Sequence, residues 1–481
     1  MVTTRRQSGR LAGEVGEDFK SPPKTPRTPK TKKATQESNG WIGDGTGAGT
    51  RGDTFITKAL SSLAVVALIV LTPPFIIILW YIHTRLGGDA FAMASLFMER
   101  GFTGLYEIWP APTLAAWRII GSFAAFEAII LLAVPGKTFN GIVTPCGNVP
   151  VYKANGVQCY VLTGVVFVAI WQLGYWNPAE VYDHFGEILS ALNIVSFGFC
   201  LFLVVKGHLC PSSTDSGSSG SPLYDFYWGM ELYPRVGPLD LKTFTNCRFG
   251  MMSWPFITFC FAIKQYELNG FVADSIIVSI VIMLAYVTKF FMWETGYWNS
   301  MDIMHDRAGY YLCWGCMCWV PCVYTSPVLY LATHPVVLGP VVSLAMGVAG
   351  VGCVYINYDS DRQRQNFRAT GGSELIWGAK PTYITAKYTT TTGETKSSLL
   401  LTSGWWGIAR HFHYLPEIMA SFFWTLPGLF NHPIHYFYVV YLTILLFDRA
   451  VRDDHRCGGK YGKYWKEYQA KVPYRVLPGI F

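Results

Sequence analysis

Long apolar runs separated by short polar segments dominate the chain from residue 59 onward. A helix needs about 20 apolar residues to cross the hydrocarbon core of a bilayer, and most of these runs approach that length. We therefore predict about ten membrane spans: 59–81, 113–134, 157–174, 188–206, 251–263, 273–293, 310–332, 336–356, 417–430 and 434–447. The pattern predicts an all-α, polytopic membrane protein.

The first 54 residues follow a different pattern. They are rich in Lys, Arg, Ser, Thr and Pro and have almost no apolar residues to bury, which predicts a disordered basic tail (1–54) before a membrane-embedded part (55–481). We expect no cleavable signal peptide, because this end is polar. Basic residues flank the membrane part at both ends, so we expect both termini in the cytosol, which requires an even number of spans.

One dinucleotide-binding pattern lies at the end of this tail. The segment 47–52 satisfies G-x-G-x-x-G, but it has no preceding strand and is followed by a membrane span. The motif binds a dinucleotide only inside a βαβ unit. We therefore interpret it as a flexible linker and expect no Rossmann domain.

The composition agrees with a membrane protein, at 51% hydrophobic and 14% charged residues. The net charge of +7 is concentrated near the ends of the chain. It therefore indicates topology and attraction to membrane lipids, with no nucleic-acid partner. Twelve cysteines lie mostly in apolar segments, which predicts reduced, buried thiols. Four of them, at 313, 316, 318 and 322, alternate with Trp and Val on a predicted span, so we expect no metal there.

Charged side chains cluster between two apolar runs, at Glu294, Asp302, His305, Asp306 and Arg307. A carboxylate facing lipid at mid-membrane costs about 2.5–3.5 kcal/mol on insertion scales. The cluster therefore either faces an internal cavity or lies in a loop at the membrane interface, and the sequence leaves both open. Glu127 lies within a predicted span, where we expect a partner on another span.

The stretch after the last apolar run is basic. If its helix continues beyond the lipid, Arg452 and Arg456 share one face, with Lys460 one turn further on. We expect Gly458 and Gly459 to end that helix. Clustered guanidinium groups suit phosphate, whether on a cofactor or on lipid headgroups, and both readings stay open.

A second basic site precedes the last two spans. Arg362, Arg364 and Arg368 lie near the end of one span, and the segment 400–414 follows a polar loop. In that segment Trp406 offers a ring for stacking and Arg410 adds charge. We interpret His411 and His413 as surface histidines, because no Cys or carboxylate has the spacing of a second metal-ligand pair.

Two longer motifs lead to a family. The chain has Tyr-Asp-Phe-Tyr-Trp-Gly-Met-Glu-Leu-Tyr-Pro-Arg at 224–235, and Arg-x-x-Arg-Asp-x-x-x-Cys-x-x-Lys-Tyr-Gly at 449–462. With them it resembles the sterol reductase family of the endoplasmic reticulum over roughly residues 100–481. Tyr233 and Asp448 stand where that family usually has Asn and His. The segments 301–306, 403–412 and 472–481 are most similar to the branch that reduces the C7–C8 double bond of Δ5,7 sterols.

The resemblance implies a ten-span reductase of the endoplasmic reticulum membrane that uses NADPH without a Rossmann domain. It implies mainly sterol-side spans at 55–357 and a cofactor-binding part at 358–481. By the same resemblance, the dinucleotide is bound by Arg364, Arg368, Leu401, Trp406, His413, Tyr414, Asp453, Cys457, Gly458, Gly459, Lys460, Tyr461 and Tyr468. The sterol enters from the bilayer, and other sterol-biosynthesis enzymes are candidate partners.

The implied chemistry needs an acid. An isolated alkene accepts hydride poorly, so we expect a general acid to protonate one carbon first. The candidates are Glu294, Asp302, Asp306 and Tyr324. Two other functions remain open: reduction of a Δ14 bond, and a scaffold similar to the lamin B receptor whose basic tail binds a partner.

Overall fold

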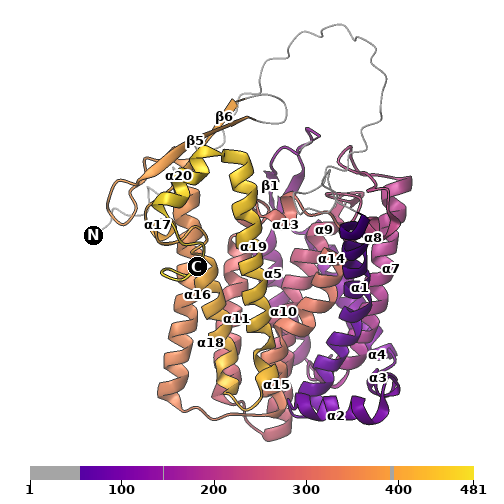
Figure 1. Ribbon diagram of the computed structural model, residues 1–481. Helices are drawn as coiled ribbons and strands as arrows, with labels where there is room; N and C mark the ends of the chain where they lie inside the picture. The colour runs from indigo at the N-terminus through magenta and orange to yellow at the C-terminus, as the bar shows by residue number, and fades with distance from the viewer. Residues whose placement is uncertain (1–54, 145, 390–394) are drawn as a thin grey trace. The chain divides into compact units, whose positions relative to one another are not determined.

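The computed structural model describes residues 55–144, 146–389 and 395–481 (Figure 1). The basic tail and the G-x-G-x-x-G segment lie outside the described residues. The described part is mostly helical, with three two-stranded antiparallel sheets, β1–β2, β3–β4 and β5–β6. It contains no Rossmann fold, as predicted.

The first group of elements runs from residue 55 to 243. Its long helices are exposed to the outside along apolar faces, as lipid-facing helices are. The elements are α1 (Phe55–Arg85), α2 (Ala90–Arg100), α3 (Thr103–Ile108), α4 (Leu114–Ala133), β1 (Lys137–Asn140), β2 (Val151–Ala154), α5 (Gly156–Gln172), α6 (Glu180–Asp183), α7 (Phe185–Leu209), α8 (Pro222–Trp228), β3 (Arg235–Val236), β4 (Leu239–Asp240) and α9 (Leu241–Thr243).

The middle group contains two π-helical segments, which pack against each other. Gly250 is the last residue of the first segment and lies very close to the second segment. A Cβ added to Gly250 would be 2.8 Å from the Cys316 carbonyl oxygen. The elements are η1 (Phe244–Gly250), α10 (Met251–Asn269), α11 (Asp274–Met292), α12 (Glu294–Tyr297), α13 (Met301–Met304), α14 (Tyr310–Trp314), η2 (Gly315–Tyr324) and α15 (Ser326–Thr333).

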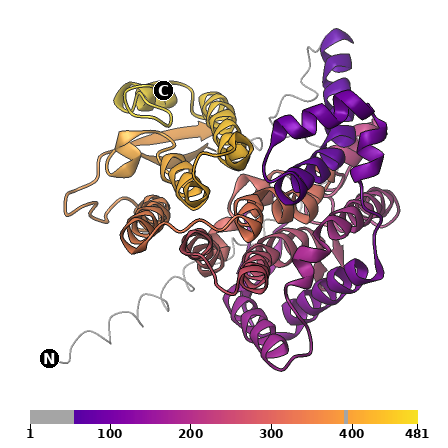
Figure 2. The same ribbon diagram turned by 90° about the horizontal axis from the view of Figure 1, so that it is seen from below.

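The C-terminal group begins with the longest helix after α1. Its elements are α16 (Pro340–Ala369), β5 (Tyr383–Thr389), β6 (Thr395–Leu401), α17 (Trp405–Ile408), α18 (Tyr414–Thr425), the 3-10 turns η3 (Leu426–Gly428) and η4 (Pro433–Tyr436), α19 (Phe437–Tyr461) and α20 (Lys463–Lys471). Helices α11, α16 and α18 pack against one another, and α19 packs against α18 (Figures 1 and 2).

A hairpin occupies a segment that the sequence analysis treated as loop. Strands β5 and β6 pair antiparallel from Tyr383↔Leu401 to Thr389↔Thr395. Ile384 and Ala386 alternate inward on β5 and pack with Trp465 and Tyr468 of α20. The hairpin, α17 and α20 thus form a cap at one end of helices α16, α18 and α19 (Figure 1).

All ten predicted spans coincide with helices. Seven helices of the described residues are long and apolar enough to cross a membrane, and α5 is a shorter apolar helix. The protein is therefore a multi-pass membrane protein. The count of ten stays a prediction, because α10 and α18 do not meet that criterion of length and hydropathy.

Candidate functional site

Trp406 lies at the centre of the residues that the resemblance assigns to a dinucleotide. Its indole Nε1 donates to the Ser360 carbonyl oxygen of α16 at 2.7 Å. The Arg364 guanidinium lies 4.0 Å from the Trp406 ring centroid, and the Tyr468 hydroxyl donates to the Trp406 carbonyl oxygen at 3.4 Å. Leu401 packs beside the Trp406 ring in a small buried cluster. Helices α16 and α20 and strand β6 therefore fix this ring.

A row of rings continues from Trp406 toward α19. The His413 ring lies 5.1 Å from Trp406 and 4.2 Å from Tyr414, and His411 stacks on Tyr414 at 5.4 Å. The Asp453 carboxylate is 3.8 Å from His411 Nε2. Burial lowers the pKa of His411 to about 4, so this imidazole is neutral near pH 7. The sequence-based interpretation of His411 as a surface histidine is wrong, since it is buried.

Helix α19 contributes one face to the site. Cys457 Sγ lies 3.7 Å from an Asp453 carboxylate oxygen, and Lys460 Nζ lies 4.3 Å from the Tyr388 ring centroid. Tyr461 packs with the hairpin and α20. The helix runs through Gly458 and Gly459 and ends at Gly462 (φ 52°), so the predicted end is wrong. Tertiary packing against the hairpin offsets the low helix propensity of two glycines.

Arg452 and Arg456 lie outside this face. Arg452 pairs with Asp448 at 2.8 Å, and Arg456 pairs with Asp453; both guanidinium groups are substantially exposed. The cations that lie beside Trp406 and Tyr468 come instead from α16, at Arg364 and Arg368. The buried stripe of this part of α19 is Ala450, Asp454 and Tyr461, with Arg449, Asp453 and Cys457 half-buried beside it.

Arg410 is committed to the protein itself. Its guanidinium makes two bonds of 3.1 Å to the Asp454 carboxylate and donates to the carbonyl oxygens of Val472 and Pro473 at 2.7 and 2.8 Å. Arg475 also donates to Asp454, at 2.9 Å. Arg410 and Asp454 are both buried. The guanidinium of Arg410 is therefore used inside the protein, and the structure does not support the expectation that it adds positive charge to a ligand site.

The polar cluster predicted between two spans divides into separate pairs. Glu294 is buried on α12 and is bound by Arg248 of η1, with one bond of 3.1 Å from Nη2. It also accepts from the Gly156 backbone N–H at 2.9 Å. With three donors on its carboxylate, Glu294 serves to join η1, α5 and α12.

The two aspartates of the cluster lie on the side nearer α19 and α9. Asp302 pairs with Arg449 of α19 at 2.7 Å. Lys242 is buried and donates to the Ile303 carbonyl oxygen at 2.8 Å and to the Asp306 carbonyl oxygen. Burial lowers the pKa of Lys242 to about 8, and the charges of Asp306, Asp240 and Asp302 oppose that shift. Within the cluster, Glu294 is buried, whereas Asp302, Asp306 and Arg307 are half-buried and His305 is exposed.

Tyr324 belongs to an aromatic cluster at the centre of the helices. Its ring is 5.1 Å from Trp254 and 4.6 Å from Tyr438, and Trp254 and Trp424 are 5.7 Å apart. These rings come from η2, α10, α19 and α18. Flat, rigid aromatic surfaces of this kind suit a flat apolar ligand.

A polar group that the sequence analysis missed joins this cluster to the ring row. The Tyr286 hydroxyl donates to the Glu417 carboxylate at 3.0 Å, and the Tyr286 ring is 5.6 Å from Trp254. Lys289 lies one helical turn after Tyr286 on α11 and donates to the side-chain oxygen of Asn357. The side-chain nitrogen of Asn357 in turn donates to the His413 carbonyl oxygen at 2.8 Å. The sequence contains a signal for this group, because Glu417 is a carboxylate at the start of a predicted span. An ionisable residue in a span is a candidate functional residue.

Other sequence-based predictions concern packing. The partner of Glu127 is on another span, as expected: Thr163 Oγ1 of α5 donates to Glu127 at 2.6 Å. Tyr233, which replaces the family's Asn, donates its hydroxyl to Asp215 at 2.8 Å. Cys313, Cys316, Cys318 and Cys322 are buried, and within the described residues no group of three or more His, Cys, Asp or Glu is placed to bind a metal.

Comparison with known proteins gives consistent matches. The ergosterol biosynthesis ERG4/ERG24 family matches residues 66–481. A protein named 7-dehydrocholesterol reductase from Arabidopsis thaliana is 57% identical over 89% of this chain and 100% of its own length. One of the same name from Danio rerio is 37% identical over 80% of this chain and 84% of its own. A Delta(14)-sterol reductase from Methylotuvimicrobium alcaliphilum is 34% identical over 86% of this chain and 94% of its own.

The Glu294–Arg248 pair gives a direct test of a structural role. Glu294→Ala leaves the buried Arg248 cation without its main partner, which costs about 3–5 kcal/mol. We expect a large loss of folded protein after detergent extraction, measured by size-exclusion chromatography and thermal unfolding. The double variant Arg248→Met/Glu294→Met should recover most of that loss, because neither charge is then buried alone.

The matched control is a pair at the surface. Glu467 lies 3.3 Å from Lys471 with both side chains about half exposed, so Glu467→Ala should change stability by no more than roughly 0.5 kcal/mol. Equal melting temperatures for Glu294→Ala and Glu467→Ala would contradict the structural role.

Proposed function

The chain belongs to the ergosterol biosynthesis ERG4/ERG24 family of sterol reductases, and we propose that it reduces the C7–C8 double bond of Δ5,7 sterols with NADPH. The relatives named 7-dehydrocholesterol reductase support the Δ7 bond, since one is 57% identical over its full length. We place the enzyme in the endoplasmic reticulum membrane with both termini in the cytosol, as the basic flanks indicate.

The observation that carries the cofactor assignment is the convergence of cations and rings on Trp406. Arg364 and Arg368 supply guanidinium groups for phosphate oxygens, and Trp406 and Tyr414 supply faces for planar rings. His413 Nδ1 is buried and has no hydrogen-bond partner within the described residues, which fits a polar ligand atom. The donor set therefore fits a phosphorylated nicotinamide dinucleotide, which supplies hydride when bound.

The dinucleotide site adjoins the aromatic cluster. Glu417 is one helical turn from Tyr414 on α18, and it accepts the hydroxyl of Tyr286, whose ring contacts Trp254. A flat sterol among these rings, reached from the bilayer, lies next to the residues at the cofactor end. The closely packed rings also exclude water from the reacting carbons.

The protein's remaining task is to deliver a proton to the alkene. The carboxylates of Glu294 and Asp302 are each bound by an arginine, so we assign both to structural contacts. A tyrosine keeps its proton in a dry site. Tyr286 is the stronger candidate, since its hydroxyl is oriented by Glu417 and neighbours both groups of rings, and Tyr324 remains the alternative. Asp306, whose backbone carbonyl oxygen accepts from Lys242, stays a further candidate.

The first experiment establishes substrate and cofactor. Membranes containing the protein should convert a Δ5,7 sterol to its Δ5 product when NADPH is supplied, and not when it is withheld, as measured by sterol mass spectrometry. A preference for a Δ8,14 sterol would make the enzyme a Δ14-reductase. Absence of turnover with either sterol would favour the scaffold function.

A second prediction concerns the two groups of arginines. Arg364→Gln removes the guanidinium over Trp406, and we expect the KM for NADPH to rise at least tenfold, since charge-assisted contacts contribute roughly 1.5–3 kcal/mol. Arg452→Gln, on the outward face of α19, is the matched control and should change KM by less than about threefold. The opposite ranking would place the phosphates on the outward face.

A third prediction separates the two tyrosines. Tyr286→Phe should lower kcat by about 10²–10⁴-fold while leaving the KM for NADPH within about threefold, because only proton delivery is lost. Tyr160→Phe, which removes a hydroxyl 3.2 Å from Thr288, controls for loss of a membrane tyrosine. A fall in kcat with Tyr324→Phe, and none with Tyr286→Phe, would assign the proton to Tyr324.

A further inference from the structure

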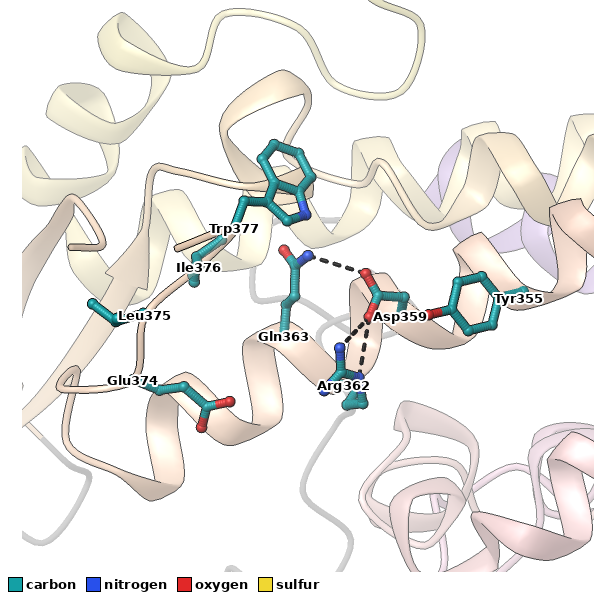
Figure 3. A pocket seen from close by; sticks show the side chains of 8 residues that line it. All are labelled: Tyr355, Asp359, Arg362, Gln363, Glu374, Leu375, Ile376 and Trp377. Carbon is teal, nitrogen blue, oxygen red and sulfur yellow. Dashed lines mark hydrogen bonds and ion pairs between the residues drawn. The ribbon is translucent and has the colours of Figure 1, made fainter. Parts of the chain in front are cut away.

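A cavity of about 330 Å³ lies at the C-terminal third of α16, away from the ring row. One wall is formed by Tyr355, Asp359, Arg362 and Gln363 of α16, and the other by the segment 374–377 that follows the helix (Figure 3). None of these residues belongs to the candidate dinucleotide site.

The geometry of α16 separates the two sites. A residue turns by about 100° around a helix, so Tyr355, Asp359 and Arg362 share one face. Arg364 and Arg368 lie on roughly the opposite face, where Arg364 covers Trp406. The cavity is therefore on the outer side of the helix and the dinucleotide residues are on the inner side.

The outer face of α16 is an apolar ridge that leads to the cavity. Val341, Leu344, Val348, Val351 and Tyr355 recur every three or four residues and are all exposed, as a lipid-facing ridge is. At 1.5 Å per residue, Arg362 lies about 33 Å from Pro340, close to the thickness of a hydrocarbon core. The cavity thus opens where acyl chains meet headgroups.

The cavity carries groups of both charges. Asp359 holds Arg362 through Nε at 3.1 Å, and the Arg362 side chain is 44% exposed, so further guanidinium N–H groups point outward. Glu374 is half-buried on the facing wall and accepts from Asn366 at 3.2 Å (Figure 3). One cation and two carboxylates give the lining a net charge of −1, which disfavours a purely anionic ligand.

Trp377 completes the cavity in a strained conformation. It has φ 51°, in the left-handed region that bulky residues avoid at a cost of about 1–3 kcal/mol. Its indole is nevertheless 61% exposed and packs at 5.0 Å, edge to face, on Trp405. An exposed tryptophan in a cavity that also contains the Glu374 carboxylate offers its ring face to an alkylammonium group.

We propose that this cavity binds the headgroup of a zwitterionic glycerophospholipid. Arg362 binds the phosphate, and Glu374 with the faces of Trp377 and Tyr355 binds the ammonium group. The acyl chains lie along the Val341–Val351 ridge of α16.

The cavity also touches the segment that carries Trp406. Trp405 Nε1 donates to Asp359 at 2.8 Å, and the Trp405 backbone N–H donates to Gln363 at 3.3 Å. A lipid packed on Trp377 therefore braces Trp405, the neighbour of Trp406. This coupling rests on the proposed function, so lipid binding is measured separately from turnover.

The test uses the purified full chain, delipidated in detergent and titrated with deuterated phosphatidylcholine or phosphatidylglycerol, with bound lipid counted by native mass spectrometry. One phosphatidylcholine should bind more tightly than phosphatidylglycerol. Trp377→Gly and Arg362→Gln should each weaken that binding about tenfold. Trp377→Gly also relieves the backbone strain, so it should fold even where Arg362→Gln does not.

The controls are an aromatic and a cation away from the cavity. Tyr175→Ala, 80% exposed, and Lys466→Gln should leave lipid binding unchanged. Equal binding of phosphatidylglycerol, displacement by inorganic phosphate alone, or unchanged binding in Trp377→Gly would each overturn the proposal. Lost lipid binding with intact turnover would uphold the lipid site and remove only the coupling.

Discussion

The buried network around Asp454 holds the candidate site together. Asp454 on α19 accepts hydrogen bonds from Arg410 before α18 and from Arg475 near the C-terminus, and Arg410 also binds the carbonyl oxygens that end α20. In addition, the backbone N–H groups of Arg410 and His411 donate to the carbonyl oxygens of Tyr474 and Arg475. A charge can be buried only when it is paired and hydrogen-bonded, and here one carboxylate satisfies two guanidinium groups. The network joins three separate stretches of the chain. It fixes the segment that contains Trp406, His411 and His413 relative to α19.

The same constraint explains which acidic groups can do chemistry. Inside a membrane protein an isolated carboxylate is costly, so most acidic side chains here are paired with cations: Glu294 with Arg248, Asp302 with Arg449, and Glu231 with Lys206. Such pairs commit these carboxylates to structural contacts between helices. Glu417 differs, because its carboxylate accepts a hydrogen bond from the neutral hydroxyl of Tyr286. A buried tyrosine carries its proton without a buried charge, which makes Tyr286 and Tyr324 candidate donors.

Much of the fold followed from periodicity, whereas the site depended on contacts between distant segments. Runs of apolar residues located every long helix, because span length is set by the bilayer. The hairpin 383–401 was missed, since its alternation of Ile384 and Ala386 is short and only packing against α20 makes it stable. Periodicity placed Arg452 and Arg456 on one face but could not say which face of α19 points inward. Similarly, Asp302 and Glu294 formed one cluster in the sequence, and only tertiary structure assigned them to different arginines.

Helix α19 is continuous from Phe437 to Tyr461, so its lipid-embedded turns and its site-forming turns are one rigid rod. Asp453 and Asp454 are adjacent on it, and the 100° between them separates the carboxylate beside His411 from the one that binds Arg410. Inserting or deleting a single residue in the membrane half would rotate both aspartates by that angle and take each away from its present partner. Exposed residues of this half, such as Val440 and Ile444, can change as lipid contact demands. The number of residues in it, by contrast, is fixed by the register at the far end.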